Sequence, residues 1–319
     1  MELTQNNMDE GMLSVKSCRQ WCVDAYSRPN PRQLWKSLWH EGEVCCLFAD
    51  SNLGKSIYAV QIGYEISKSR KVLYFDFELS DKQFQLRYTD SELDKIVNFP
   101  DNFMRAEIDP DMMSQYADMG SFEDAIIENI ESAALRYDCK TLIIDNLTYI
   151  CNQSDKGDAA GRLMMNLMNL KKRYGWSILV IAHTPKRSLS SPITQNDLAG
   201  SKRLFNFFDS VFAIGKSARD NNLRYIKQLK VRSGAFEYDS DNVLLADIRK
   251  DDAMLYFHEL GTACEKAHLA EPDDDDWKQV NDHIIELWNQ GTMSQQAIAN
   301  HLKISAGKVN KVIKAHRCS

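Results

Sequence analysis

Short apolar runs alternate with longer amphipathic stretches over much of the chain. The runs that have the character of buried strands lie at residues 44–48, 72–77, 141–144 and 178–182. Helical spacing of apolar residues begins at Lys55 and returns around Phe84. Strands that alternate with helices are typical of a mostly parallel sheet covered on both faces. The pattern therefore predicts an α/β core that begins near Leu34.

Four further apolar runs follow one another closely later in the chain. They lie at residues 210–214, 223–231, 243–248 and 254–257. Lys250, Asp251 and Asp252 supply turn residues between the last two runs. Connections this short favour antiparallel hairpins, which we expect at an edge of the sheet.

The stretch AEPDDDDW interrupts this pattern with a proline and four successive aspartates. A charge run of this kind is typical of a solvated linker. We therefore expect four parts in the chain: an N-terminal arm over residues 1–30, the core over residues 31–268, an acidic linker over residues 269–276 and a small all-α domain over residues 277–319.

The last part has the apolar pattern of a helix-turn-helix, supported by a first helix over residues 277–288. Ser294 and Ser305 are expected to cap the two following helices, with Lys303 and Ile304 in the turn between them. The side chains expected to face inward are Ala297, Ile298, Leu302, Val309, Val312 and Ile313.

The second of these helices would expose four polar side chains. Lys308, Lys311 and Lys314 would form a basic stripe suited to DNA phosphates, and Asn310 would be available for a base edge. The alternative is a helical docking domain whose lysines are simply solvated.

Charge is divided unevenly along the 319-residue chain, whose net charge is −6. Residues 277–319 contain six Lys and Arg against Asp282 and Glu286, a net charge of +4, which leaves −10 for residues 1–276. This balance argues against a protein that coats nucleic acid over its whole surface.

The cysteines and the lack of a long apolar run indicate where in the cell the protein is expected. The eight cysteines lack the spacing of a metal knuckle, and Cys45 and Cys46 lie in an apolar run, so reduced thiols are expected. No run approaches the roughly 20 apolar residues that cross a bilayer, and the N-terminus does not resemble a leader. We expect a cytoplasmic protein with no membrane contact.

Residues 49–56, Ala-Asp-Ser-Asn-Leu-Gly-Lys-Ser, have the pattern of a phosphate-binding loop whose first glycine is replaced by Ala49. The loop follows a predicted strand and opens a predicted helix, so its N–H groups would surround phosphate oxygens. Lys55 would neutralise charge on the β- and γ-phosphates of ATP, and Ser56 would bind Mg²⁺. The alternative is a chance match in a β–α turn. The residues expected to contact nucleotide are Ser51, Asn52, Leu53, Gly54, Lys55 and Ser56.

Two carboxylates follow predicted strands of the same core. Asp145 ends one strand, which is expected next to the phosphate-binding loop, where it could hold Mg²⁺ through water, although many buried strands end in aspartate. Glu78 ends another, where it could orient and deprotonate the water that attacks the γ-phosphate. The alternative for Glu78 is an acid favoured by a helix N-terminus.

These motifs together resemble the RecA-like ATPase domains of hexameric replicative helicases, in particular the DnaB and RepA families. The resemblance is carried by the alanine-headed loop, by Phe77-Glu78-Leu79-Ser80 with Gln83 and Arg87, and by further motifs over about residues 34–260. In the DnaB family the loop commonly begins with alanine, so Ala49 resembles a family variant. Only about 30 residues precede the core, as in RepA-like plasmid and mobile-element helicases.

The resemblance implies roles for three more residues. His183, in SILVIAHTPKR, stands where this superfamily has a γ-phosphate sensor, and LAGSKRLFNFFDSVFAI resembles its next motif. Lys230 and Arg232, in QLKVRSG, match residues that reach the γ-phosphate bound to a neighbouring subunit, which implies a homo-oligomer, a hexameric ring. A hydrogen-bonded core histidine and a solvated strand face are the alternatives.

The resemblance also implies a DNA-contacting channel formed by residues 152–161 and 186–202. The basic residues that could contact single-stranded DNA there are Lys156, Lys186, Arg187, Lys202 and Arg203.

The expected function is a DNA-dependent ATPase, a RepA/DnaB-like helicase or related motor serving replication or mobilisation. It would use ATP and Mg²⁺, with single-stranded DNA in the ring and duplex on the helix-turn-helix. The alternatives are an ATP-sensing DNA-binding regulator that does not translocate, and a structural P-loop protein that docks a protein partner.

Overall fold

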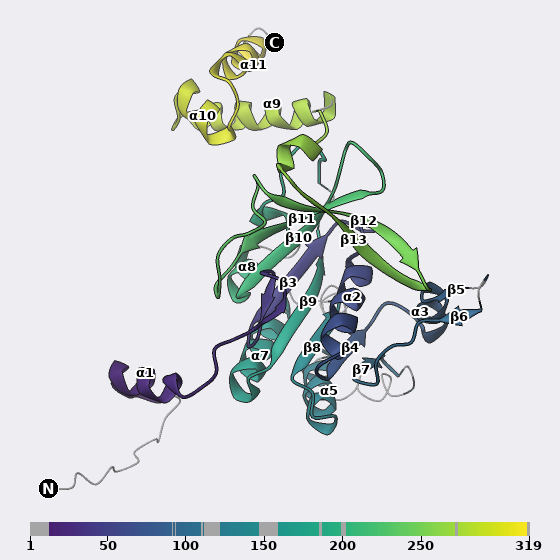
Figure 1. Cartoon of the computed structure of the whole chain (residues 1–319). Helices are drawn as coiled ribbons and strands as arrows, with labels where there is room; N and C mark the ends of the chain where they lie inside the picture. Colours follow the sequence, from purple (N-terminus) through teal and green to yellow (C-terminus); the bar gives the residue numbers. More distant parts are fainter. Residues whose placement is uncertain are drawn as a thin grey trace, which may run out of the picture. The chain divides into compact units, whose positions relative to one another are not determined.

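Figure 1 shows the computed structural model of the chain. The residues described are 13–90, 92, 94–109, 111, 122–146, 159–184, 187–198, 202–271 and 274–317. The chain divides into two units, one ending at Arg32 and the other beginning at Gln33. Each unit is described by itself.

The first unit contains a short helix that was not expected from the sequence, α1 (Cys18–Tyr26). Ser17 caps it by accepting a hydrogen bond from the Gln20 N–H at 3.1 Å. No residue of α1 is buried.

The second unit is built on one nine-stranded sheet. In their order across it, the strands are β13 (Met254–Ala263), β12 (Val243–Asp251), β11 (Leu223–Lys230), β10 (Ser210–Lys216), β3 (Val44–Ala49), β9 (Ser177–His183), β8 (Thr141–Asp145), β4 (Val72–Asp76) and β7 (Phe103–Ala106). The strands from β10 to β7 are mutually parallel, and β11, β12 and β13 pair antiparallel. The α/β core with a mostly parallel central sheet is therefore confirmed, with hairpins at one edge.

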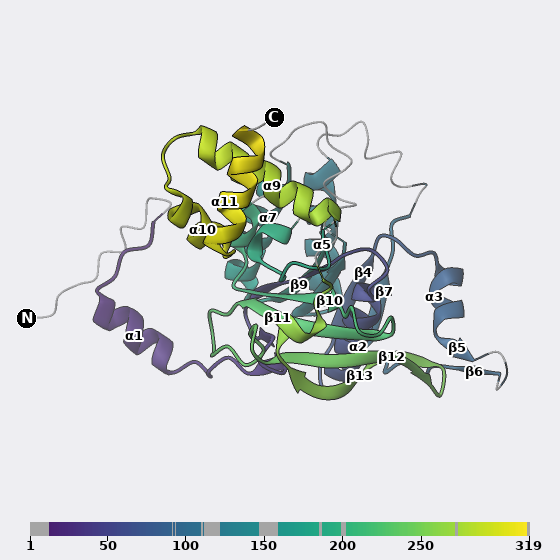
Figure 2. The ribbon, with the colours of Figure 1, turned by 90° about the horizontal axis from the view of Figure 1, so that it is seen from above.

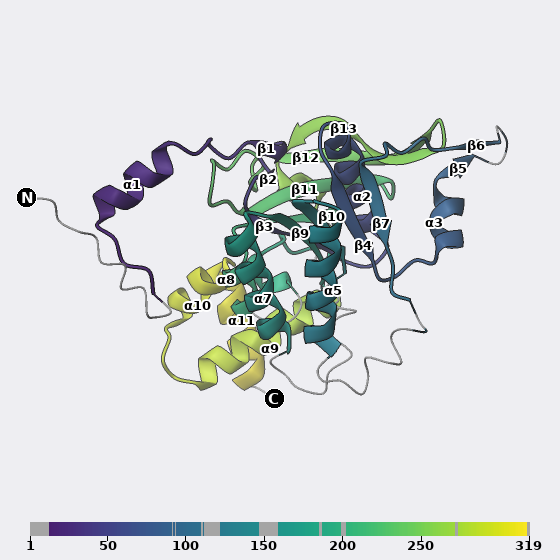
Figure 3. The same ribbon diagram turned by 90° about the horizontal axis from the view of Figure 1, so that it is seen from below.

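Helices cover both faces of this sheet, as Figures 2 and 3 show. Along β3, Cys45 and Leu47 pack with α2 (Lys55–Ser67) on one face, because successive strand residues point to opposite sides. Cys46 and Phe48 pack on the other face, where α5 (Phe122–Arg136), α7 (Ala159–Tyr174) and α8 (Lys202–Phe207) contribute buried residues.

Short elements complete the core. They are β1 (Gln33–Trp35), β2 (Trp39–His40), α3 (Asp81–Arg87), β5 (Thr89–Asp90), β6 (Lys95–Ile96), η1 (Gln195–Asp197) and η2 (Glu265–His268). The strands β1 and β2 form one small antiparallel sheet, and β5 and β6 form another.

The C-terminal helices have an apolar core of their own. They are α9 (Asp274–Asn289), α10 (Gln295–Leu302) and α11 (Ala306–Arg317), which pack around Ile284, Ile298, Val309 and Ile313. Ser294 and Ser305 cap the last two helices through the N–H groups of Ala297 and Lys308.

Two details of this region correct the expectations. Helix α9 begins at Asp274, so the end of the acidic run belongs to its first turn rather than to a linker. Carboxylates are favoured there because the helix dipole is positive at its N-terminus. Ala297 is exposed, and Ala299 is buried in its place.

Among the described residues, no helix is long and apolar enough to cross a membrane. The cysteines of the same part of the chain are all free thiols, as expected, and Cys45, Cys46 and Cys139 are buried.

Candidate nucleotide-binding site

The phosphate-binding loop joins β3 to α2, as its sequence predicts. Gly54, the N-cap of α2, has a φ of 94°, and Asn52 has a φ of 64°. A Cβ on Gly54 would lie 2.9 Å from Cδ1 of Ile248 and 3.0 Å from the ring of Phe257. Glycine is therefore required at position 54 both by the left-handed backbone and by the contact with the β12–β13 hairpin. Ala49 is the buried last residue of β3, where an ordinary extended backbone accepts a methyl group.

Lys55 lies in the first turn of α2 and is buried. Its Nζ donates hydrogen bonds to the carbonyl oxygens of Ala49 and Asp50, each at 2.9 Å. Burial lowers the pKa of Lys55, while Asp145, Glu78 and Asp50 act in the opposite direction. The ammonium group is therefore held at the base of the loop among three carboxylates.

A cavity of about 450 Å³ opens beside this loop, a size typical of small-molecule sites. Its lining residues are Ser51, Asn52, Gly54, Lys55, Ser56, Ile57, Glu78, Arg87, His183 and Ile248. Five of the six residues predicted to contact nucleotide are among them. The exception is Leu53, whose side chain is buried in the core beside α2.

Asp145 ends β8, but that strand is separated from β3 by β9 rather than adjacent to it. Its Oδ2 accepts a hydrogen bond from the Tyr74 hydroxyl at 2.6 Å. Burial raises the pKa of Asp145 to about 6, against the lowering effects of the Ser56 and Tyr74 hydroxyls. Glu78 and Asp76 raise it further by charge repulsion.

The residues predicted to bind Mg²⁺ fit such an ion. Within the described part of the chain, Oδ1 of Asp145 is buried without a completed hydrogen bond, although the Ser56 hydroxyl lies close enough to lower the pKa. No group of three or more His, Cys, Asp and Glu side chains there could hold a metal alone. One carboxylate and one hydroxyl suit Mg²⁺, which commonly takes its other ligands from phosphate and water.

Glu78, Asn146 and His183 meet at one side of the cavity. The Asn146 side-chain amide donates a short hydrogen bond to Oε1 of Glu78, and its Nδ2 lies 3.1 Å from Nε2 of His183. Nε2 of His183 lies 3.3 Å from Oε1 of Glu78. The His183 hydrogen bond, more than any other contact, lowers the pKa of Glu78, with help from Asn146 and Lys55. Glu78 is therefore ionised at neutral pH.

Three cavity residues and Asn146 were not predicted as site residues. Arg87, Ile57 and Ile248 line the cavity, and Arg87 already appeared in the motif around Glu78. Asn146 directly follows Asp145, so its position next to a residue predicted to bind Mg²⁺ could have indicated a place in the site. Ile248 comes from β12, nearly 200 residues after the loop, and no local pattern marks it.

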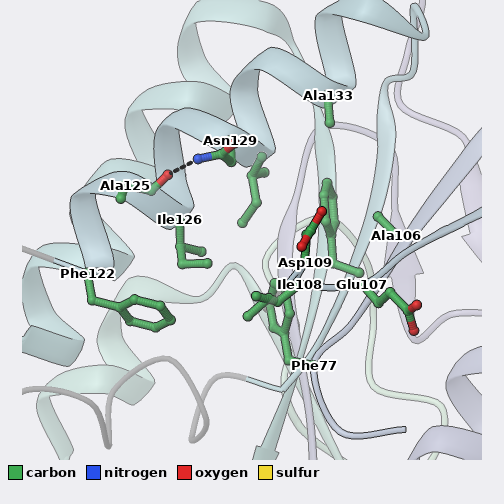
Figure 4. Close-up of a pocket in the computed structure, with 12 residues that line it drawn as sticks. Phe77, Ala106, Glu107, Ile108, Asp109, Phe122, Ala125, Ile126, Asn129 and Ala133 are labelled. Atoms are coloured by element: carbon green, nitrogen blue, oxygen red, sulfur yellow. Dashed lines mark hydrogen bonds between the residues drawn. The ribbon is translucent and has the colours of Figure 1, made fainter. Parts of the chain in front are cut away.

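A second cavity, of about 270 Å³, lies between α5 and the carboxyl ends of β4 and β7 (Figure 4). Phe77, Ile108, Phe122 and Ile126 form much of its wall. Among the described residues that line it, the charged ones are Glu107 and Asp109, which would repel phosphate. We therefore assign nucleotide to the cavity at the phosphate-binding loop.

Lys230 and Arg232 lie at the other end of the sheet. Lys230 pairs with Val211 near the start of β10, which in turn pairs with Cys46 of β3. Arg232 makes an ion pair of 2.7 Å with the buried carboxylate of Asp209, which also accepts a hydrogen bond from the Val44 N–H. Neither residue lines the cavity, so this arrangement does not support a role in their own subunit's site.

The residues predicted to contact DNA are only partly described. Lys156 and Lys186 lie outside the described residues, and Lys202 and Arg203 begin α8. Arg187 donates a short hydrogen bond to the Ser191 carbonyl oxygen within its loop. On α11, Asn310, Lys311 and Lys314 are exposed and Lys308 is partly buried.

A phosphate-binding loop at the start of a helix, with one carboxylate at the end of β8 and another just beyond the end of β4, defines a P-loop nucleotide-binding protein. Residues 16–188 match a family model described as "AAA domain". The matched residues make up more than half of the chain. The chain therefore belongs to the AAA domain family, and the predicted P-loop ATPase class is confirmed.

The comparison of structures agrees on the fold. The KaiC-like protein PH0186 from the hyperthermophilic archaeon Pyrococcus horikoshii OT3 matches with a TM-score of 0.50 and 10% sequence identity, over 69% of this chain and 91% of that one. No curated protein matches the chain.

Replacing Asp145 by asparagine tests the buried carboxylate. The pKa of Asp145 is raised from the ordinary value of 3.8 to about 6, so the carboxyl destabilises the fold by an amount that grows as pH rises from 3.8 to about 6 and is complete above pH 6. Asp145→Asn should therefore raise the free energy of unfolding of the nucleotide-free protein by about 2 kcal/mol more at pH 7.5 than at pH 4. Urea unfolding at both pH values measures the difference.

Asp94→Asn supplies the control, because it removes an exposed carboxylate by the same substitution and leaves Asp145 in place. Asp145→Asn should also abolish Mg²⁺-dependent hydrolysis of ATP. Equal stability effects at both pH values, or retained Mg²⁺-dependent turnover, would contradict the assignment.

Proposed function

We propose that the protein is a DNA-dependent ATPase, a motor of the RepA/DnaB-like hexameric helicase type that serves replication or mobilisation of plasmid-like elements. The observation that carries the proposal is the convergence of Lys55, Glu78 and His183 on one cavity beside the phosphate-binding loop. AAA domain membership and the fold support nucleotide hydrolysis. The DNA-dependent part rests on the sequence resemblance and on the basic face of α11.

Five residues of the site have chemical tasks in this proposal: Lys55, Ser56, Glu78, Asp145 and His183. The N–H groups of the loop and the ammonium group of Lys55 bind the phosphates, because both direct positive charge at the phosphate oxygens. Ser56 and Asp145 would hold Mg²⁺, which supplies charge neutralisation between the β- and γ-phosphates. Glu78, kept ionised by its neighbours, accepts a hydrogen bond from the attacking water and orients it. His183 lies against Glu78 and reports the state of the γ-phosphate end.

The position of Arg232 supports a site that is shared between subunits. Its side chain is 58% exposed. It follows Lys230, which pairs with Val211 near the start of β10, at the end of the sheet away from the phosphate-binding loop. A guanidinium that reaches transferring phosphate from a neighbour is worth about 10³–10⁵ in rate. We propose that Lys230 and Arg232 serve the site of the next subunit in a ring.

The C-terminal helices supply the proposed duplex-binding domain. Their separate apolar core indicates that they form a unit, and exposed Lys311, Lys314 and Asn310 share the outer surface of α11. Lysines of this kind contact phosphates, while an asparagine can pair with an adenine edge. Residues 152–161 and 186–202 are proposed to contact a single strand of DNA.

Steady-state ATP hydrolysis without DNA, with single-stranded DNA and with duplex DNA tests the proposal. At matched salt, single strands should stimulate turnover several-fold. Lys55→Ala should abolish turnover under all three conditions, because the phosphates lose their main counter-charge. The same variant shows whether a contaminating ATPase contributes to the measured rate. Equal, slow turnover under all conditions would contradict a motor.

A second variant separates the motor from an ATP-sensing DNA-binding regulator. Lys311→Ala with Lys314→Ala should weaken duplex binding and reduce its salt dependence by about two phosphate contacts, while leaving hydrolysis without DNA unchanged. If this variant also removes all stimulation by single strands, the C-terminal helices are the main DNA-binding element and the regulator is favoured. No binding to either DNA form at low salt would favour a protein-docking role.

Mixed assemblies test the shared site. Lys55→Ala chains lack phosphate binding and Arg232→Ala chains lack the proposed trans-acting group, so neither should hydrolyse ATP alone. Mixing the two should restore part of the activity, because some interfaces then combine an intact loop with an intact Arg232. Hydrolysis is measured after light scattering has verified mixed assemblies. No recovery in such assemblies would contradict sharing.

A further inference from the structure

The segment that carries Glu78 has little regular structure of its own. Residues 77–80 form a bend between β4 and α3, and the Glu78 side chain is 42% exposed. A general base must be held within hydrogen-bond reach of its water, so something must fix this backbone. One support is β8, because the Phe77 N–H donates to the Asp145 carbonyl oxygen at 2.7 Å.

The stronger support is the carboxylate of Asp76. Its Oδ1 accepts hydrogen bonds from the N–H groups of Glu78 at 3.2 Å and Leu79 at 2.9 Å. Asp76 is the last residue of β4 and only 2% exposed, so the rigid sheet holds it in place. Both peptide groups that flank the Glu78 side chain are thereby tied to the sheet.

Arg105 completes the arrangement from β7, the neighbouring edge strand, where it is in register with Tyr74 of β4. Its Nε donates to Oδ2 of Asp76 at 3.0 Å, and its Nη2 donates a short hydrogen bond to the Leu79 carbonyl oxygen. One guanidinium thus joins the carboxylate that holds the bend to the bend itself. Lysine has no planar fork that could make both contacts in this geometry.

The same guanidinium also contacts α3. It lies 5.0 Å from the centre of the Phe84 ring, within the range of a cation–π contact. Helix α3 ends at Arg87, which lines the nucleotide cavity. Arg105 therefore contacts both the bend that carries Glu78 and the side chain of Phe84 in α3.

A contribution to folding stability is a weak explanation for the ion pair between Asp76 and Arg105. The Asp76 side chain is 1% exposed and that of Arg105 is 18% exposed, so both charges are largely removed from water. Apolar replacements of buried ion pairs are often equally stable. What such replacements would lack here is the set of directed hydrogen bonds to the N–H groups and carbonyl of the bend.

We propose that Asp76 and Arg105 are positioning residues for hydrolysis, which fix the backbone of Glu78 and thereby set the reach of its carboxylate. The inference rests on the proposed role of Glu78 in ATP hydrolysis. Neither Asp76 nor Arg105 lines the nucleotide cavity, so loss of the pair lowers kcat and leaves nucleotide binding nearly unchanged.

Arg105→Lys in the full-length protein tests the inference. It should lower kcat by about 10- to 100-fold, since misplacing a catalytic group by about 1 Å costs up to about 100-fold. The Kd for an ATP analogue should change by less than about 2-fold. Glu107→Gln is the matched control, because it removes only the other ion pair of Arg105, with a carboxylate that is 48% exposed, and should leave kcat unchanged.

Two further variants separate positioning from general damage. Asp76→Asn breaks the ion pair but keeps the Oδ1 acceptor, and it should lower kcat with unchanged Kd, which carries the test if Arg105→Lys does not fold. In a Glu78→Gln background, Arg105→Lys should cause almost no further loss, because the two changes act on one group.

The outcomes distinguish this inference from the proposed function. Unchanged kcat in folded Arg105→Lys and Asp76→Asn, with inactive Glu78→Gln, would overturn the positioning role alone. A parallel loss of kcat and of nucleotide affinity would overturn it too, since that result indicates general damage to the site. Full activity of Glu78→Gln would overturn the proposed role of Glu78 and the inference with it.

Discussion

The parallel register of β3, β9, β8 and β4 is the constraint on which the site depends. Ala49 is paired with His183 and Asp76 with Asp145, so the carboxyl ends of these four strands lie side by side at the same end of the sheet. Helix α2 begins at this same end, and its first turn presents Lys55. Residues separated by well over a hundred positions in the chain thereby line one cavity. A slip of one residue in any of these strands would turn its terminal side chain to the other face.

Charge held at this end of the sheet opposes folding and serves the proposed chemistry. Burial raises the pKa of Asp145 and lowers that of Lys55, so each charged form is disfavoured in the folded protein. The carboxylates near Lys55 offset part of its cost. A nucleotide with Mg²⁺ would bring negative phosphates to Lys55 and a positive ion to Asp145. Because it binds the folded protein, it would also stabilise the fold. Glu78 differs from both, because its hydrogen bonds favour the charged form.

Much of the site could be predicted from the sequence because its chemistry follows local patterns. The phosphate-binding loop needs contiguous residues between a strand and a helix, and Glu78, Asp145 and His183 each stand at the end of an apolar run. The order of the strands could not be predicted, since nothing local indicates that β9 separates β3 from β8. Arg105 and Ile248 were missed for the same reason, as their roles depend on pairing between distant strands. The start of α9 was misplaced because an aspartate run suits both a linker and the first turn of a helix.

The carboxyl end of the sheet is proposed to bind Mg²⁺ and ATP, and a crystal structure with a non-hydrolysable ATP analogue and Mg²⁺ would test this proposal. The phosphates should lie against the N–H groups of residues 51–56, with Lys55 at the β- and γ-phosphates. Mg²⁺ should lie between Ser56 and Asp145, and the γ-phosphate should face Glu78. Nucleotide bound elsewhere, or phosphates placed away from Lys55 and Asp145, would contradict it.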